Sequence, residues 1–210
     1  NAAGTSRYGG VLVAAGDDHN CKSSTLPQQS EYSFINAMMP ILNPANVHEL
    51  IEFGLLGFGL SRFSGCWVGM KVIPETADAS QTIDFDHDRF EIVEPDFDLP
   101  PEGLSIRWPD PPLEQEARLH RHKLRAAGAF ARANRLNRIV IDGPAACFGI
   151  ITTGKSHGDT LQALEDLGIK ERRASEIGIR LLKVGMSWPL EVEVVHQFAD
   201  GLEEIFIVEE

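Results

Sequence analysis

GVLVAAGDDHNCKSSTLPQQSEYSF, residues 10–34, is the stretch that decides the fold of this chain. Residues 11–15 form a short apolar run, which predicts a buried strand. Gly16 ends the run, a dense polar loop follows, and Pro27 leads into residues 28–38, whose composition predicts a helix. This order of strand, loop and helix is typical of an open α/β sheet, in which ligands bind beyond the carboxyl ends of the strands. We therefore expect any substrate to be contacted by this loop.

The overall composition excludes several classes of protein. The chain has 31 Asp and Glu residues against 19 Lys and Arg, which gives a formal net charge of −12. This acidic excess argues against a nucleic-acid-binding surface. The sequence also lacks an apolar run of about 18 residues, the length that a membrane-spanning helix needs. We expect a soluble, cytoplasmic protein with neither nucleic acid nor a membrane as its partner.

The three cysteines, Cys21, Cys66 and Cys147, lie far apart in the sequence and form no CxxC pair. Zinc sites and iron–sulfur clusters use closely spaced cysteines, so neither is predicted here. We expect buried free thiols, as in proteins of a reducing cytoplasm.

The first 80 residues continue the α/β pattern. Asn46 with Glu49 three positions later predicts the start of a helix in which the Glu side chain reaches back to the cap, and this helix should end near Gly65. Short strands are expected at residues 39–42 and 66–73. From residue 74 to 112 acids and prolines dominate, which favours an extended connector. The alternation of Ile83 and Phe85, and of Phe90 and Ile92, predicts one or two half-exposed strands there.

The remaining residues predict a second α/β unit. Asp110, followed by two prolines, should cap one long helix that runs to about Arg135, and Ser156 with Asp159 should cap another that stops at Gly168. A third helix is expected between Pro189 and Gly201. Strands alternate with these helices, which implies right-handed crossovers and a mainly parallel sheet. The predicted strands are residues 138–141, 147–152, 179–184 and 205–208.

GIITTGKS, residues 149–156, matches the phosphate-loop pattern GxxxxGK[ST]. That pattern requires a loop whose N–H groups turn onto phosphate, whereas Ile150 and Ile151 directly follow Phe148 in a run that predicts a strand. We interpret the match as fortuitous, with a weak anion-binding helix start at most. A nucleotide-binding protein using Lys155 and Ser156 remains the alternative.

Several segments together resemble the indolepyruvate:ferredoxin oxidoreductases, within the 2-oxoacid:ferredoxin oxidoreductase family. The resemblance covers essentially the whole chain and points to the large bacterial multi-domain form, of which this chain would be an internal fragment. The segments are GDDHNCKSSTLPQQSEYSF, ILNPANVHEL, LSRFSGCWVGMKV, RANRLNRIVID, GIITTGKS, EIGIRLLKVGMSWPLE and GLEEIFIVEE.

The resemblance implies an α/β architecture in three parts. Residues 1–80 would be the C-terminal half of a thiamine pyrimidine-type module, and residues 81–112 an acidic, Pro-rich connector. Residues 113–210 would form a transketolase C-terminal-like domain with three α/β/α layers and a mainly parallel sheet.

The resemblance also implies a function in amino-acid catabolism. The parent enzyme would oxidatively decarboxylate indolepyruvate and other arylpyruvates to acyl-CoA, with ferredoxin as the electron acceptor. It would use thiamine diphosphate, Mg²⁺, coenzyme A and iron–sulfur clusters, and would contact further domains of the same polypeptide and form a homo-oligomer. No complete catalytic set is expected in this fragment, which should be inactive and bind none of these cofactors itself. A non-catalytic subunit-docking module is a further alternative.

The loop that opens the sequence borders the active-site cleft in the family. Three adjacent polar residues there could indicate metal binding or acid–base chemistry, but their residue types alone favour solvation or helix capping, and we expect no metal. Pyruvate-using relatives have an Arg just after the matching strand, where this chain has Gly16, Asp17 and Asp18. Lys22 is therefore the nearest cation for a substrate carboxylate. The substrate-loop candidates are Asp17, Asp18, His19, Lys22, Ser23, Ser24, Gln28 and Gln29.

Overall fold

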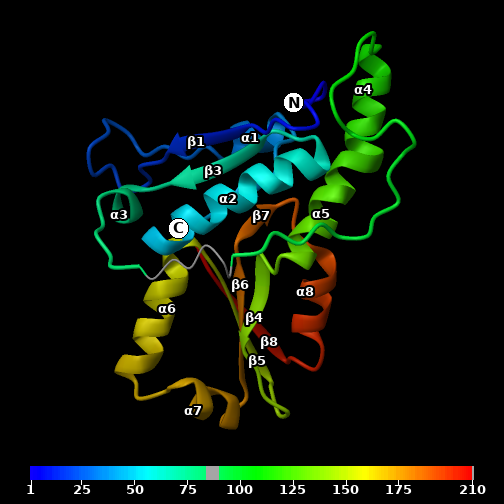
Figure 1. The fold of residues 1–210 in the computed structure, drawn as a ribbon. Coiled ribbons are helices and arrows are strands. Elements are labelled where there is room, and N and C mark those ends of the chain that lie inside the picture. The colour runs from blue at the N-terminus through cyan, green and yellow to red at the C-terminus, as the bar shows by residue number, and fades with distance from the viewer. Residues whose placement is uncertain (84–89, 210) are drawn as a thin grey trace.

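Two four-stranded sheets lie one above the other in the protein, as Figure 1 shows. The structure is a computed structural model that describes residues 1–83 and 90–209. The strand order is β1-β3-β2-β7 in the upper sheet and β4-β6-β5-β8 in the lower sheet. The strands are β1 (Leu12–Gly16), β2 (Ile41–Leu42), β3 (Val68–Val72), β4 (Asn137–Ile141), β5 (Phe148–Thr153), β6 (Ile179–Val184), β7 (Met186–Trp188) and β8 (Glu204–Val208).

Helices connect these strands and cover both sheets. They are α1 (Glu31–Asn36), α2 (Val47–Ser64), α3 (Pro74–Ala77), α4 (Pro112–Arg118), the π-helical turn η1 (Leu119–Lys123), α5 (Leu124–Ala133), α6 (Gly154–Asp166), α7 (Glu171–Glu176) and α8 (Val192–Ala199). No helix of the described chain is both long and apolar enough to cross a membrane.

The upper sheet is parallel except at one edge. β1 and β2 both pair with β3 in parallel, and β7 pairs with β2 in the antiparallel direction. Because successive side chains of a strand point to opposite faces, Ile41 packs with Phe34 of α1, whereas Leu42 packs with Phe53 of α2. The face under α2 also takes up Phe130 of α5, so this core includes residues far apart in the sequence.

The lower sheet has helices on both faces, which confirms the predicted three-layer α/β/α arrangement. β5 pairs in parallel with β6 and β8, as a mainly parallel sheet requires, while β4 is antiparallel to β6. Leu181 packs against Leu164 of α6 on one face, and the next residue, Leu182, packs against Phe198 of α8 on the other. Figure 1 shows α6 and α7 on one side of this sheet and α8 on the opposite side.

A single stretch of chain belongs to both sheets, because β6 continues through Gly185 into β7. A Cβ atom on Gly185 would lie 2.4 Å from the carbonyl oxygen of Leu136 and 2.7 Å from the Phe53 ring. Only glycine fits this junction without moving its neighbours. The predicted division of the chain at residues 80 and 112 stays a prediction, but β7 and α5 join the upper layer from beyond that boundary.

The start of α2 largely follows its prediction. The Asn46 side chain accepts the N–H of Glu49 at 3.0 Å, and Gly65, with a φ of 71°, ends the helix. The Glu49 carboxylate does reach back, but it accepts the N–H of Ala45 at 2.8 Å instead of that of Asn46. Its second oxygen binds the ammonium of Lys183 of β6.

Two predicted helix caps were wrong. Asp110 does not cap the long helix, because its carboxylate binds the Arg118 guanidinium. The helix itself runs without a gap from Pro112 to Ala133, with the π-helical turn η1 between α4 and α5. Ser156 does not cap α6, which begins two residues earlier at Gly154. The Asp159 carboxylate instead binds Lys155, four residues before it.

Other predictions need smaller corrections. Phe90 and Ile92 lie in an irregular segment and not in a strand, whereas Phe85 falls outside the described residues. All three cysteines are free, as predicted, but only Cys66 is buried; Cys147 is exposed. The helix predicted over residues 28–38 is shorter, because the chain pairs Gln28 with Asp18 before α1 begins.

Candidate functional site

The carboxyl ends of strands from both sheets meet at the junction of the two layers. Asn43, directly after β2, donates its side-chain N–H to Thr153 at the end of β5, at 3.2 Å, and its backbone N–H to the carbonyl of Gly185, at 2.8 Å. Figure 1 shows the loop after β1, the helix α3 and the start of α6 on the same side of the molecule. Open α/β sheets bind ligands at such an edge, so the junction is the candidate site.

Asp17 fixes the beginning of the loop after β1. Its N–H continues the pairing with β3 by donating to the carbonyl of Val72 at 2.9 Å, and its carboxylate accepts the N–H and the hydroxyl of Ser30, both at 3.0 Å. The ammonium of Lys71 lies 4.0 Å from this carboxylate and 2.5 Å from that of Glu31. Asp17 and Lys71 are both buried, so the group ties β1, β3 and α1 together.

Asp18 organises the tip of the loop. One carboxylate oxygen accepts the N–H of Lys22 at 2.7 Å, and the other accepts the N–H groups of Ser23 and Ser24, each at 2.8 Å. These N–H groups, that of Ser23 foremost, hold the pKa of the Asp18 carboxyl well below its usual range. A carboxylate used in this way orders the backbone and is not available as a general base.

Two neighbouring clefts border the loop. One, of about 280 Å³, lies against the end of β3 and the start of α3, and includes Asp17, Asp18, Ser23, Ser24 and Gln28 in its lining. The other, of about 350 Å³, lies between the loop and the first turn of α6. Its lining is His19, Asn20, Glu75, Lys155 and Asp159.

The structure therefore brings together five of the predicted loop residues and separates the others. His19 faces the second cleft, whereas Lys22 and Gln29 line neither cleft. Lys22 is exposed at the ordered turn that Asp18 holds. Sequence reasoning did not find Lys71, Glu31, Glu75 or Lys155 as neighbours of the loop, since no spacing in the sequence relates them to it.

The phosphate-loop pattern is not a phosphate loop. Ile150 and Ile151 lie inside β5, so their N–H groups serve the sheet, as the sequence analysis predicted. Lys155 is paired with Asp159. The side chain of His157 is buried, and its Nδ1 lies 2.9 Å from the hydroxyl of Thr152. These residues stabilise the start of α6.

The described side chains near the loop do not form a set of ligands for the implied cofactors. Within residues 1–83 and 90–209 no three His, Cys, Asp or Glu side chains are arranged to hold a metal ion. Both oxygens of Asp18 are already occupied by N–H donors. The loop does not fit a magnesium–diphosphate group, and we derive no step through one.

Comparisons with known proteins support the resemblance. A model of the family described as "Indolepyruvate ferredoxin oxidoreductase middle domain" matches residues 137–210. The subunit IorA of the indolepyruvate oxidoreductase from Methanothermobacter marburgensis is 26% identical over 205 residues, which cover 96% of this chain and 31% of that protein. The corresponding subunit from Pyrococcus abyssi is 28% identical over 209 residues, covering 96% and 30%. The chain spans less than a third of the length of these curated relatives.

A solved structure has a similar fold. It is a 2-oxoglutarate:ferredoxin oxidoreductase from Magnetococcus marinus with 2-oxoglutarate, coenzyme A and succinyl-CoA bound. The TM-score is 0.57 at 16% sequence identity, over 93% of this chain and 40% of that one. At this identity the similarity concerns the fold alone.

Proposed function

We propose that this chain is part of an enzyme that oxidatively decarboxylates arylpyruvates. The premise is that these matches support a fragment of the indolepyruvate ferredoxin oxidoreductase family. The product would be an acyl-CoA, and ferredoxin would accept the electrons. The single observation behind this proposal is the similarity to indolepyruvate oxidoreductase subunits over 96% of the chain. The similar fold of an oxidoreductase that acts on another 2-oxoacid is consistent with it.

The cofactor chemistry belongs to other parts of the parent enzyme in this proposal. Thiamine diphosphate with Mg²⁺ and the iron–sulfur clusters would need clustered ligands, and the described residues offer no such set. This chain would supply the framework of the two sheets and a loop that contacts the substrate. The isolated chain is therefore expected to be inactive.

Within the loop, Lys22, Ser23 and Ser24 are proposed to contact the substrate carboxylate. Asp18 holds all three backbone N–H groups, so the side chains project from an ordered turn. Lys22 is the cation of this turn and Ser23 lies at the cleft that faces β3. An ordered donor set loses less entropy on binding than a mobile one.

The test uses the parent enzyme that contains this chain. Reduction of ferredoxin is followed with indolepyruvate and with pyruvate in the presence of coenzyme A. Indolepyruvate should be the better substrate, and Lys22→Gln should raise its KM several-fold with little change in kcat, because a contact made equally in the ground and transition states is lost. Lys170→Gln, at an exposed lysine, is the control. Absence of turnover with any arylpyruvate would refute the proposed function. Equal effects of the two substitutions would refute only the role of Lys22.

A further inference from the structure

Positive charge is concentrated in one segment of this acidic chain. Residues 117–141 contain seven Arg and Lys residues and no Asp or Glu, although the whole chain has a net charge of −12. The segment covers the last two residues of α4, all of η1 and α5, and β4. The fold uses some of these cations and leaves the others on the surface.

Some of these cations have partners inside the protein. Arg118 binds the Asp110 carboxylate, and Arg138 lies 3.4 Å from that of Glu49. Lys123 is fully buried, where its ammonium donates to the carbonyl of Ala2 at 2.9 Å and lies 3.3 Å from that of Gly65. These three groups stabilise the fold.

The other cations face solvent. Between residues 120 and 135, every residue that the structure leaves exposed is basic: His120, Arg121, Arg125, Arg132 and Arg135. We call the last four the arginine stripe. Arg132 pairs with Glu191 yet remains half exposed, and among the described residues Arg121, Arg125 and Arg135 form no ion pair.

Helical spacing places three arginines of the stripe on one face, and Arg135 lies two residues beyond the end of α5. Arg125 follows Arg121 by four residues, and Arg132 follows Arg125 by seven, so their side chains project in similar directions. The opposite face of α5 is buried against α2 through Ala127 and Phe130. At 1.5 Å per residue the stripe is roughly 20 Å long, the width of a small docking surface.

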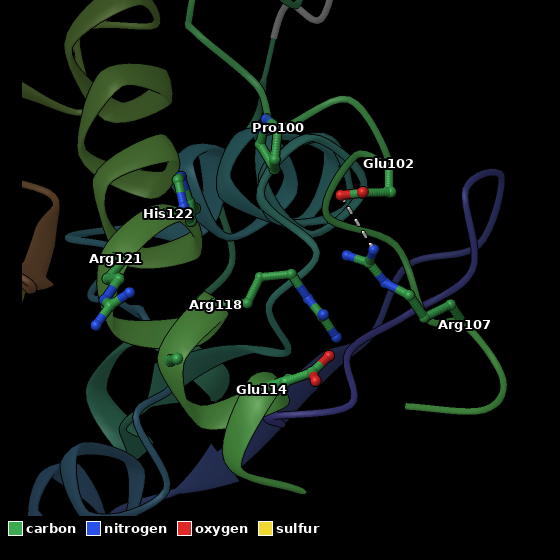
Figure 2. Close-up of a pocket in the computed structure, with 8 residues that line it drawn as sticks. Pro100, Glu102, Arg107, Glu114, Arg118, Arg121 and His122 are labelled. Carbon is green, nitrogen blue, oxygen red and sulfur yellow. Dashed lines mark ion pairs between the residues drawn. The ribbon is translucent and has the colours of Figure 1, made fainter. Parts of the chain in front are cut away.

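A pocket of about 240 Å³ lies beside the stripe, and Figure 2 shows it. Arg118 and Glu114 extend to one side of the helix, toward Arg107, whose guanidinium lies 3.5 Å from the Glu102 carboxylate. Arg121 extends to the other side of the helix. Arg107 and Arg118 thus have carboxylate partners within the protein, whereas Arg121, which also lines the pocket, points away from them.

We propose that the arginine stripe docks a separate protein subunit through a cluster of Asp and Glu carboxylates on that subunit. Planar guanidinium groups form paired hydrogen bonds with carboxylates, which suits three arginines on one helical face and a fourth, Arg135, just beyond the helix end. A long polyanion such as nucleic acid would also meet the acidic remainder of this chain and be repelled. A compact acidic patch can contact Arg121 and Arg125 foremost, because Arg132 and Arg135 share a cleft with Asp142, Glu191 and Glu193. This inference does not depend on the proposed enzymatic activity.

The test measures binding of fluorescently labelled poly-L-glutamate to the 210-residue chain at low salt, by anisotropy. The variant Arg121→Gln/Arg125→Gln should weaken binding by roughly five-fold or more, since each exposed ion pair contributes about two- to five-fold. Arg172→Gln/Arg173→Gln removes two exposed arginines from α7 and is the matched control, expected to change binding less than about two-fold. Gln is a good helix former, so both variants should keep their helices.

Three outcomes would overturn the proposal. The first is no binding of poly-L-glutamate by the unaltered chain at low salt. The second is an equal loss of binding in the two variants, which would indicate attraction without a defined surface. The third is tighter binding of a single-stranded oligonucleotide of the same charge, which would make nucleic acid the partner.

Discussion

The carboxylate of Glu49, at the start of α2, binds the ammonium of Lys183, in β6, and joins the upper layer of the protein to the lower sheet. Both side chains are almost completely buried, and Arg138 adds a second cation at 3.4 Å. Lys183 belongs to the same stretch of chain that passes through Gly185 into β7. The two layers are therefore connected at the same place by the continuous chain of β6 and β7 and by a buried ion pair.

Removing the negative partner of this pair should be costly. Glu49→Gln leaves Lys183 buried without a counter-ion, and we expect a loss of about 3 kcal/mol in the free energy of unfolding, measured by urea denaturation. Adding Lys183→Met should restore part of the loss, because the orphan charge is then gone. Glu165→Gln, which breaks an exposed pair with Lys170, should cost less than about 1 kcal/mol. A similar loss for the buried and the exposed substitution would contradict this account.

The junction between β6 and β7 should not accept a side chain. Gly185→Ala would bring Cβ to 2.4 Å from the carbonyl of Leu136, so backbone must move, and we expect a destabilisation of about 1–3 kcal/mol. Gly158→Ala lies inside α6 with open space around its Cβ and should instead stabilise by about 0.5–1 kcal/mol. Thermal unfolding of the two variants measures both effects. Similar shifts in Tm for both would mean that the junction is not constrained.

His157 should make stability depend on pH. Burial, with a smaller contribution from the charge of Arg138, lowers the pKa of His157 to about 4, from 6.5 in the unfolded chain. Between these values the unfolded state binds more protons, so stability falls as the pH decreases through this window. The free energy of unfolding of the unaltered chain should therefore be about 2 kcal/mol lower at pH 5 than at pH 7.5 because of His157.

The control for this prediction is His157→Asn, which can keep a hydrogen bond to Thr152 but does not titrate. Urea denaturation at both pH values measures how much free energy of unfolding each protein loses on acidification. Subtracting one loss from the other cancels the contributions of the other titrating groups. An identical pH dependence of the two proteins would exclude His157 as the cause.

Asp18 should control the order of the loop tip. Asp18→Asn retains one acceptor oxygen in place of two, so it cannot hold the N–H groups of Lys22, Ser23 and Ser24 together. Amide hydrogen exchange should accelerate at these three positions and remain unchanged in β3. Asp166→Asn, at the end of α6, is a control without loop contacts. Unchanged exchange at residues 22–24 would show that the loop is ordered by other contacts.

Local patterns predicted much of the fold. The bounds of β6 were predicted without error, and Gly65, Gly168 and Gly201 follow their helices with positive φ angles, as stop signals should. The polar loop after β1 was also found, but the favoured interpretation of its aspartates as solvated or helix-capping groups was wrong: both are buried, Asp18 binds N–H groups within the loop, and α1 has no side-chain cap. These features depend on residues close together in the sequence.

The features that the sequence did not predict depend on contacts between distant segments of the chain. β7 has only three residues and pairs with β2, more than a hundred positions earlier, so no periodicity could indicate it. The division of the long predicted helix at η1 coincides with Lys123, whose ammonium is held by the carbonyls of Ala2 and Gly65. The neighbours of the loop, such as Lys71 and Lys155, likewise come from distant elements.

The sequence by itself determined most strands, the main helices and the polar loop, because each follows from a side-chain pattern over a few residues. Its composition determined the excess of negative charge. Only the tertiary structure decided which strands pair, where Glu49 and Lys183 meet and which arginines stay exposed. The physical reason is that burial and ion pairing depend on distances between remote segments. Those distances exist only once the two layers have packed together.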